Sequence, residues 1–247
     1  MVAPRHLPKA PITEALVDIR VKLAADTELA KLGSIHELIV DQYPKRKERR
    51  RREFSFEFKE GEPPRQTATD IADGYFYISS DDKQIVQARL DGFTFSRLKP
   101  YEKWESMRDE ARRLWQLYVK FASPEFITRI AVRYINHLNI PLPFLDFAEY
   151  LTAPPIVPPD LPQGVGSFLT RVVVIEPNLG ASAAITQALE PQAQKDFITI
   201  ILDIDVFKQA QFALDSNESW DLLEAFRDFK NKIFFGSVTE RTLRLCE

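Results

Sequence analysis

The chain has 247 residues, of which 45% are hydrophobic and 28% are charged, the composition of an ordinary soluble globular protein. This length can fold as one large domain or two small ones without disulfide or metal staples. The one cysteine, Cys246, cannot form an internal disulfide, which favours a reducing compartment. No stretch approaches the roughly 18 apolar residues of a membrane span, and prolines at 4, 8 and 11 interrupt the start where a signal peptide needs an apolar core. We therefore expect a cytoplasmic protein that is neither inserted in a membrane nor exported by that route.

The net charge of −3 conceals a skew along the chain. Residues 1–140 carry 25 basic and 21 acidic side chains, whereas residues 141–247 carry 8 and 15. The positive excess comes from residues 45–52, where seven of eight side chains are cationic. Such a run can bind nucleic acid, contact an acidic protein, or be a solvated loop that guards the entrance of an edge strand. No aromatic residue interrupts the run, so base stacking is not indicated. The cations are Lys45, Arg46, Lys47, Arg49, Arg50, Arg51 and Arg52.

The first half of the chain predicts a strand, a helix, a meander of strands and a second helix. Alternation of apolar residues indicates the strands, and apolar stripes at helical spacing indicate the helices. Pro44 ends the first helix, Asp91-Gly92 is typical of a tight hairpin, and Pro124 closes the half. The predicted ranges are strands over 12–23, 53–59, 74–80, 84–90 and 92–98, helices over 27–42 and 100–121, and a Pro-containing loop at 62–65.

The second half repeats this order in outline. A strand again opens it, a short helix and a Pro-rich loop follow, and a meander leads to a last helix. The predicted ranges are strands over 126–138, 168–176, 181–189 and 196–207, helices over 143–151 and 217–235, and the Pro-rich loop over 152–167.

The repeated order predicts an α+β protein built from two pseudo-repeated β-α-β(n)-α units, over residues 1–123 and 124–247, either as two units or fused into one domain. We expect one or more antiparallel sheets with helices packed on one face and a concave surface or groove opposite. A groove of this kind can hold a ligand or a partner.

Motifs for catalysis and metal binding are missing from the sequence. His6, His36 and His137 lie far apart and away from Cys246, so no zinc-site spacing exists. There is no G-x-S-x-G nucleophile elbow and no phosphate-binding glycine loop. We therefore expect no catalytic residue, no metal and no cofactor, and a protein that is not an enzyme.

Two sets of polar residues remain as candidates. Asp203 and Asp205 alternate with apolar residues, so both carboxylates point to one face of a strand. They can bind a divalent cation there, or this face of the strand can simply be exposed to solvent. The other set can present donors to an anionic group in a groove, or can pair internally with acids such as Asp18 or Asp203. It consists of Arg97, Arg129, Arg133 and Asn136.

Three motifs spread along the chain carry a family resemblance. They are Pro11-Ile12-Thr13-Glu14-Ala15, the segment from Phe93-Thr94-Phe95-Ser96-Arg97 to Pro100-Tyr101-Glu102-Lys103-Trp104, and Arg133-Tyr134-Ile135-Asn136. With them the chain resembles a family of sporadically distributed, uncharacterised prokaryotic proteins, and the likeness extends to the closing segment 234–242. The resemblance implies no established enzyme function and no cofactor. The family's patchy distribution looks like that of genes on mobile or defence-related elements.

The leading functional hypothesis is a non-enzymatic interaction protein, a component of a multi-protein system that associates with itself or with a partner protein. The opposite charges of the two halves would favour a head-to-tail contact. One alternative is a nucleic-acid-binding protein that uses residues 45–52. The other is a protein that binds a small anionic ligand in the groove through Arg133 and Asn136.

Overall fold

A computed structural model describes residues 7–57, 65–191 and 194–247. Residues 62–64 of the loop predicted over 62–65, and His6, lie outside these residues. In chain order the elements are β1 (Ile12–Lys22), α1 (Leu29–Gly33), α2 (Ile35–Ile39), β2 (Lys45–Glu57), β3 (Arg65–Ile78), β4 (Gln84–Arg89), β5 (Gly92–Leu98), α3 (Trp104–Ala122), β6 (Phe126–Pro141), the 3-10 helix η1 (Phe147–Glu149), β7 (Leu169–Glu176), β8 (Ala181–Leu189), β9 (Phe197–Phe212), α4 (Glu218–Ser237) and α5 (Glu240–Arg244).

All nine strands form one antiparallel sheet in the order β2-β3-β4-β5-β1-β6-β9-β8-β7. The predicted α+β class and its antiparallel sheet are therefore confirmed. The strands that open the two predicted units, β1 and β6, are neighbours inside the sheet. Each pairs on its other side with the last strand of its own meander, β5 or β9.

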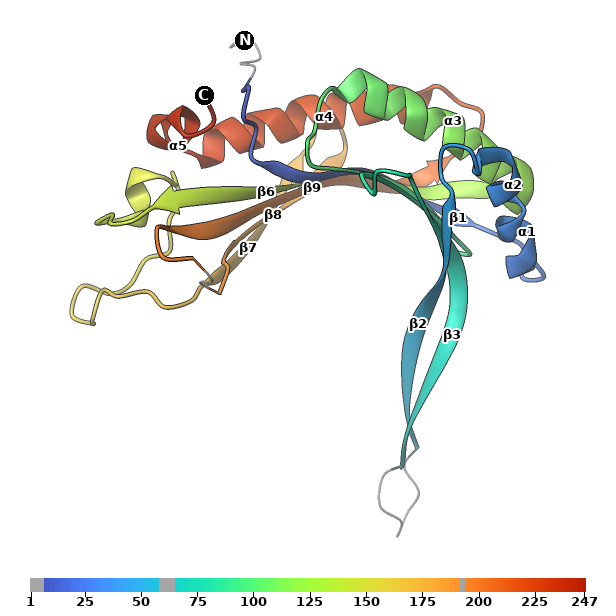
Figure 1. Ribbon diagram of the computed structural model, residues 1–247, viewed down its shortest axis with the longest axis horizontal. Helices are drawn as coiled ribbons and strands as arrows, with labels where there is room; N and C mark the ends of the chain where they lie inside the picture. The colour runs from blue at the N-terminus through green and yellow to red at the C-terminus, as the bar shows by residue number, and fades with distance from the viewer. Residues whose placement is uncertain (1–6, 58–64, 192–193) are drawn as a thin grey trace.

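The core lies between the sheet and the long helices α3 and α4, which run above it in Figure 1. Alternation along β1 turns Val17 and Ile19 into this core, where both are fully buried. From α3, Trp115 meets Phe93 of β5 edge-on with ring centroids 5.9 Å apart. We call this side of the sheet the helix face and the opposite side the open face.

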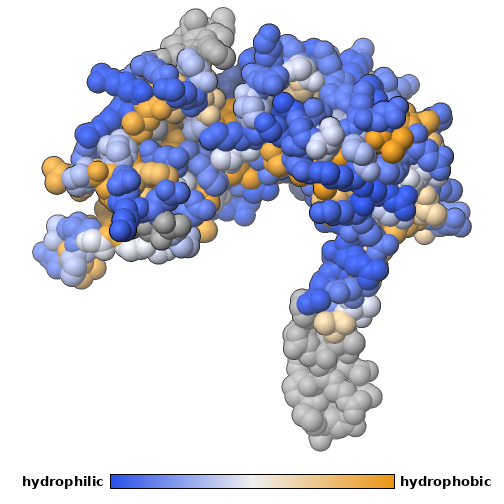
Figure 2. Space-filling view, viewed as in Figure 1, coloured by the Kyte–Doolittle hydropathy of each residue, from blue (hydrophilic) through white to orange (hydrophobic). Residues whose placement is uncertain are grey.

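The sheet forms an arch, and its open face is the hollowed underside in Figures 1 and 2. The hairpin of β2 and β3 projects from one end of the arch. Only residues 74–78 of β3 also pair with β4, so the rest of the hairpin is a two-stranded ribbon, which we call the arm. Strand β7 and the segment 152–167, which contains no helix or strand, lie at the other end.

The hairpin predicted at Asp91-Gly92 is confirmed, and its geometry requires glycine. Gly92 has φ +152°, and a Cβ atom there would lie 2.3 Å from the carbonyl oxygen of Ile19 on β1. A side chain would therefore push apart two central strands.

Five element predictions need correction. The segment predicted as one helix over 27–42 forms two short helices, α1 and α2. Ser34 is both the C-terminal cap of α1 and the N-terminal cap of α2. The basic run lies inside β2 and not in a loop, because β3 pairs with it from Lys45 to Arg52 and supplies acidic partners. The helix over 143–151 is a single 3-10 turn capped by Asp146. The strand predicted over 74–80 starts at Arg65, where the sequence predicted the end of a loop, because β2 pairs with it along its whole length. Helix α5 was not predicted.

Candidate functional site

The centre of the open face carries a network of ion pairs around Asp18 of β1. Its carboxylate accepts hydrogen bonds from Arg89 (2.9 Å), Arg129 (2.9 Å) and the Thr94 hydroxyl (2.7 Å), and Arg20 reaches it at 3.1 Å. These partners come from β4, β6, β5 and β1, so the network ties the middle of the sheet together. Asp18 is 7% exposed and Arg89 3%, so both charges are buried against one another.

The network continues toward β9. Arg129 donates to Asp205 at 2.9 Å, and Arg133 forms a two-pronged pair with Asp203 at 2.8 and 2.6 Å. Both carboxylates point to one face of β9, as the alternation predicts, and both are engaged by guanidinium groups. Among the described residues there is no cluster of three His, Cys, Asp or Glu side chains that could hold a metal ion.

Burial and charge compete at these acids. Burial disfavours the charged form of Asp18, but Arg89, Arg20 and the Thr94 hydroxyl outweigh it and hold the pKa of Asp18 below its ordinary value. For Asp205 the balance is reversed, because burial raises its pKa despite the attraction of Arg129 and Arg133. The network is thus a charged structural tie, with each buried arginine paired as desolvation requires.

The four predicted groove residues do not share one surface. Arg129 and Arg133 lie on the open face, whereas Asn136, at the opposite parity in β6, is buried on the helix face and donates to the Leu202 carbonyl at 2.9 Å. Arg97 of β5 is also on the helix face and contacts Glu102 at 3.2 Å. The expectation that Arg133 and Asn136 hold one ligand together is therefore wrong, because an odd separation along a strand places side chains on opposite faces.

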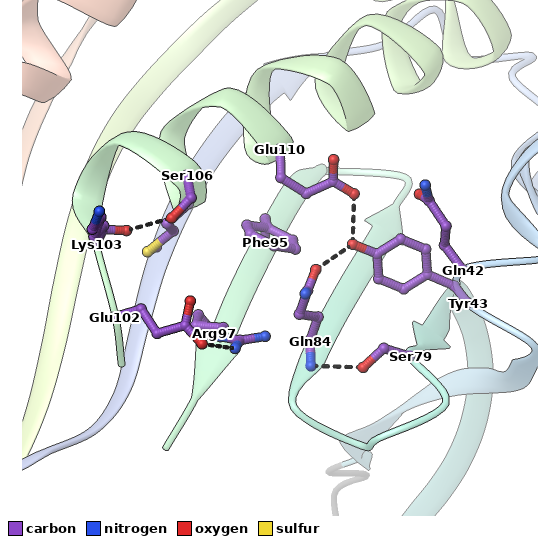
Figure 3. Close-up of a pocket in the computed structure, with 11 residues that line it drawn as sticks. Gln42, Tyr43, Ser79, Gln84, Phe95, Arg97, Glu102, Lys103, Ser106 and Glu110 are labelled. Atoms are coloured by element: carbon purple, nitrogen blue, oxygen red, sulfur yellow. Dashed lines mark hydrogen bonds and ion pairs between the residues drawn. The ribbon is translucent and has the colours of Figure 1, made fainter. Parts of the chain in front are cut away.

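Arg97 lines a polar cavity of about 420 Å³ beneath α3 (Figure 3). The Tyr43 hydroxyl lies 2.7 Å from Oε1 of Gln84 and 2.7 Å from Oε1 of Glu110. Burial, followed by the contact with Glu110, raises the pKa of Tyr43, so its phenol stays protonated. Glu110 also pairs with Arg113 at 2.7 Å. Tyr43, Gln84 and Glu110 thus bond to one another within the lining, as Arg97 does to Glu102, which leaves these groups little to gain from a ligand.

The basic run lines β2 and the base of the arm. Most of its charges have acidic neighbours, including Asp82 for Lys45 (2.6 Å), Glu48 for Arg50 (2.7 Å) and Asp70 for Arg52 (2.8 Å). Further pairs join Arg49 to Asp73 and Arg51 to Glu53, and Arg46 lies 4.8 Å above the Tyr75 ring. The run is thus exposed, as predicted, but its positive charge is partly compensated by flanking acids.

The opposite edge of the sheet has a different character. Strand β7 exposes Leu169 (73%), Val173 (53%) and Ile175 (74%), with Val172 also exposed. It carries only Arg171 and Glu176 as charged residues. Within the described residues, no backbone hydrogen bond joins its outer edge to another segment. An apolar, unpaired edge strand is a ready site for the addition of another strand.

Sequence reasoning missed Lys230 of α4, which is 7% exposed and lines a second cavity on the helix face. A signal was present, because Lys230 follows Phe226 by four residues and precedes Ile233 by three, which places it in the apolar stripe of the predicted helix. A lysine at such a position is buried unless its stem extends to the rim.

Comparison of the chain with protein-family models, curated proteins and solved structures finds no match. No helix among the described residues has both the length and the apolar character needed to cross a membrane.

Proposed function

We propose that the protein is a non-enzymatic interaction protein that pairs with a second copy of itself through the outer edge of β7, as a component of a multi-protein system. The observation that carries this proposal is the exposed apolar edge of β7, with no backbone partner among the described residues. Natural sheets protect such edges with charge, proline or a covering segment. An edge without this protection is stabilised by a partner strand.

The two ends of the sheet explain why β7 is the edge that pairs. At the other end, β2 carries the seven cations of residues 45–52, and two copies of β2 would bring like charges together. Antiparallel pairing of β7 about a two-fold axis at Val173 places Val172 opposite Val174 and Arg171 opposite Ile175. No like charges face one another, and the stem of Arg171 covers the exposed Ile175. This edge-to-edge contact replaces the head-to-tail arrangement that the charge skew favours.

The mass of the protein in solution tests the proposal. Light scattering after size exclusion should give twice 28.5 kDa for the wild-type chain. Val173→Lys places a charge at the proposed axis and should give the monomer mass, with an unchanged circular dichroism spectrum. Leu38→Lys is the matched control, because Leu38 is an exposed aliphatic residue on α2, and this helix lies toward the opposite end of the arch from β7 (Figure 1). A monomeric wild type, or a Val173→Lys variant that still dimerises, would rule out the proposed edge.

We also propose that the chain is a duplicated β-α-β(n)-α unit with its helices packed on one face, a member of the sporadically distributed family that its motifs resemble. The supporting observation is the sheet order, in which β5-β1 and β6-β9 mirror each other about the β1–β6 pair. The first unit has one more meander strand than the second, and by its place in the sheet order this extra strand is β2, one of the two strands of the arm.

A second candidate function, nucleic-acid binding, is supported by the shape of the arm. A two-stranded antiparallel ribbon fits the major groove of B-DNA, and cations such as Arg51 and Arg52 lie along this one. Exposed ion pairs such as Arg52 with Asp70 contribute little, so phosphates can compete for these arginines.

Anisotropy of a labelled duplex at two salt concentrations tests this candidate. Arg51→Ser with Arg52→Ser should weaken binding and reduce the slope of log affinity against log salt by about 2. Lys31→Ser with Lys120→Ser removes the same charge from exposed sites elsewhere and should leave the slope unchanged. Equal slopes for the two double variants would remove the arm as a binding site.

A further inference from the structure

A cavity of about 700 Å³ lies on the helix face between α4, the start of α3 and the segment 7–12. This volume suits a small organic molecule. Apolar walls come from residues such as Phe234, Phe235 and Ile12, and the deepest polar groups include Lys230 and Asn136. The cavity is separate from the outer edge of β7, so what it binds does not depend on the proposed assembly.

Lys230 is the unusual group in this cavity. Its ammonium lies 3.8 Å from the centre of the Tyr134 ring and donates to Oδ1 of Asn231 at 2.6 Å. An ammonium has three donors, and within the described residues no carboxylate lies within 4 Å of this one. A buried lysine normally has a counter-charge. Here the protein supplies a ring face and one amide oxygen.

The charges around Lys230 explain how it can respond to a bound molecule. Burial, together with repulsion from Arg227, lowers the pKa of Lys230 to about 7, and Asp228 opposes this effect. The other titratable groups that line the cavity from α3 and the residues before it are Tyr101, whose hydroxyl lies 3.1 Å from that of Tyr134, and the exposed Glu102, Lys103 and Glu105 at the rim. An anion beside the ammonium would restore its charged form and fill the missing contacts.

We propose that this cavity binds a small amphipathic carboxylate, with its carboxyl group on Lys230 and its apolar part against Phe234 and Phe235. The apolar walls favour a hydrocarbon body, and the single buried cation favours one negative charge. Arg227, which also lines the cavity, adds to the attraction for an anion at the entrance.

Calorimetric titration of the full chain with 4-phenylbutyrate, hexanoate and phenylacetate at pH 6.5 tests the proposal. At least one acid should bind, and its neutral amide should bind about tenfold more weakly or worse, because the amide cannot pair with the ammonium. Binding of the acid should also weaken by about tenfold or more between pH 6.5 and 9, as Lys230 loses its proton. This second measurement uses the wild-type chain alone.

Lys230→Met keeps the length and the apolar stem but removes the charge, and it should weaken binding of the acid by about tenfold or more. Lys232→Met is the matched control, because Lys232 is exposed on the same helix, and it should retain wild-type affinity. Circular dichroism and the melting temperature show that both variants are folded. The proposal fails if no acid binds below about 10 mM, if amide and acid bind equally, or if Lys230→Met binds as wild type.

Discussion

Replacement of Asp18 by Asn tests whether the open-face network holds the sheet together. Asn has the same shape, but it removes the charge shared by Arg89, Arg129 and Arg20. Arg129 still pairs with Asp205 and is partly exposed, so the substitution removes little of the stabilisation of this arginine. Arg89 is 3% exposed and keeps only the solvent-accessible Asp91 as a counter-charge, so one buried cation becomes largely uncompensated. Breaking a buried pair costs about 3–5 kcal/mol, and the remaining partners place Asp18→Asn near 3 kcal/mol.

Urea unfolding at pH 7 measures this cost, with an unchanged m-value as the sign that the native state is intact. Asp203→Asn is the control, because its partner Arg133 is about half exposed, and it should cost at most about 1 kcal/mol. If Asp18→Asn costs no more than Asp203→Asn, the network does not stabilise the fold. The free energy of unfolding also depends on pH through Asp18, because its pKa is lower in the folded chain than in the unfolded one. The stability that Asp18 contributes is therefore complete above the unfolded pKa near 3.8 and is lost as the pH falls below this value.

Two further predictions concern single positions. The pKa of Lys230 is about 7 in the folded chain against 10.5 in the unfolded one, so the unfolded chain binds more protons between these values. Wild-type stability should therefore rise by about 2 kcal/mol relative to Lys230→Met from pH 7 to 9, and a difference that is constant with pH would contradict the burial of this charge. Gly92→Ala places a Cβ against the Ile19 carbonyl at a positive φ and should destabilise by about 2 kcal/mol or more in chemical unfolding. Gly166→Ala, which meets nothing within 4 Å, should change stability by less than about 0.5 kcal/mol, and equal effects would refute the steric argument.

The sheet was largely predictable, because local alternation determines which side of a strand is buried. Val17 and Ile19 indicated β1, and Asp91-Gly92 indicated the β4–β5 hairpin. The same rule also separates Arg133 from Asn136, so the failure of that proposed pair could have been read from their spacing of three. The pairing of arginines with Asp18 and Asp203 was among the alternatives that the residue types allowed, and it is the arrangement found.

What the sequence could not supply depends on contacts between distant segments. The basic run looked like a loop because local repulsion opposes a strand, but Asp70 and Asp73 arrive from β3 to offset it. The Lys230 cavity needs α4, α3 and the segment 7–12 together, and no local pattern places these side by side. Only the position of Lys230 in an apolar stripe hinted that it is buried.

The exposed edge of β7 is the feature on which the proposed assembly depends, and oxidative cross-linking tests it directly. Pairing about Val173 brings the two copies of this residue to a Cα separation of about 4.5–5.5 Å, within the range of a disulfide. Val173→Cys should therefore give a covalent dimer under mild oxidation. Ile175→Cys should not, because its two copies would lie about 13 Å apart along the strands, and the native Cys246 is buried. A Val173→Cys protein that stays monomeric under oxidation, or cross-links no faster than Ile175→Cys, would contradict the assembly.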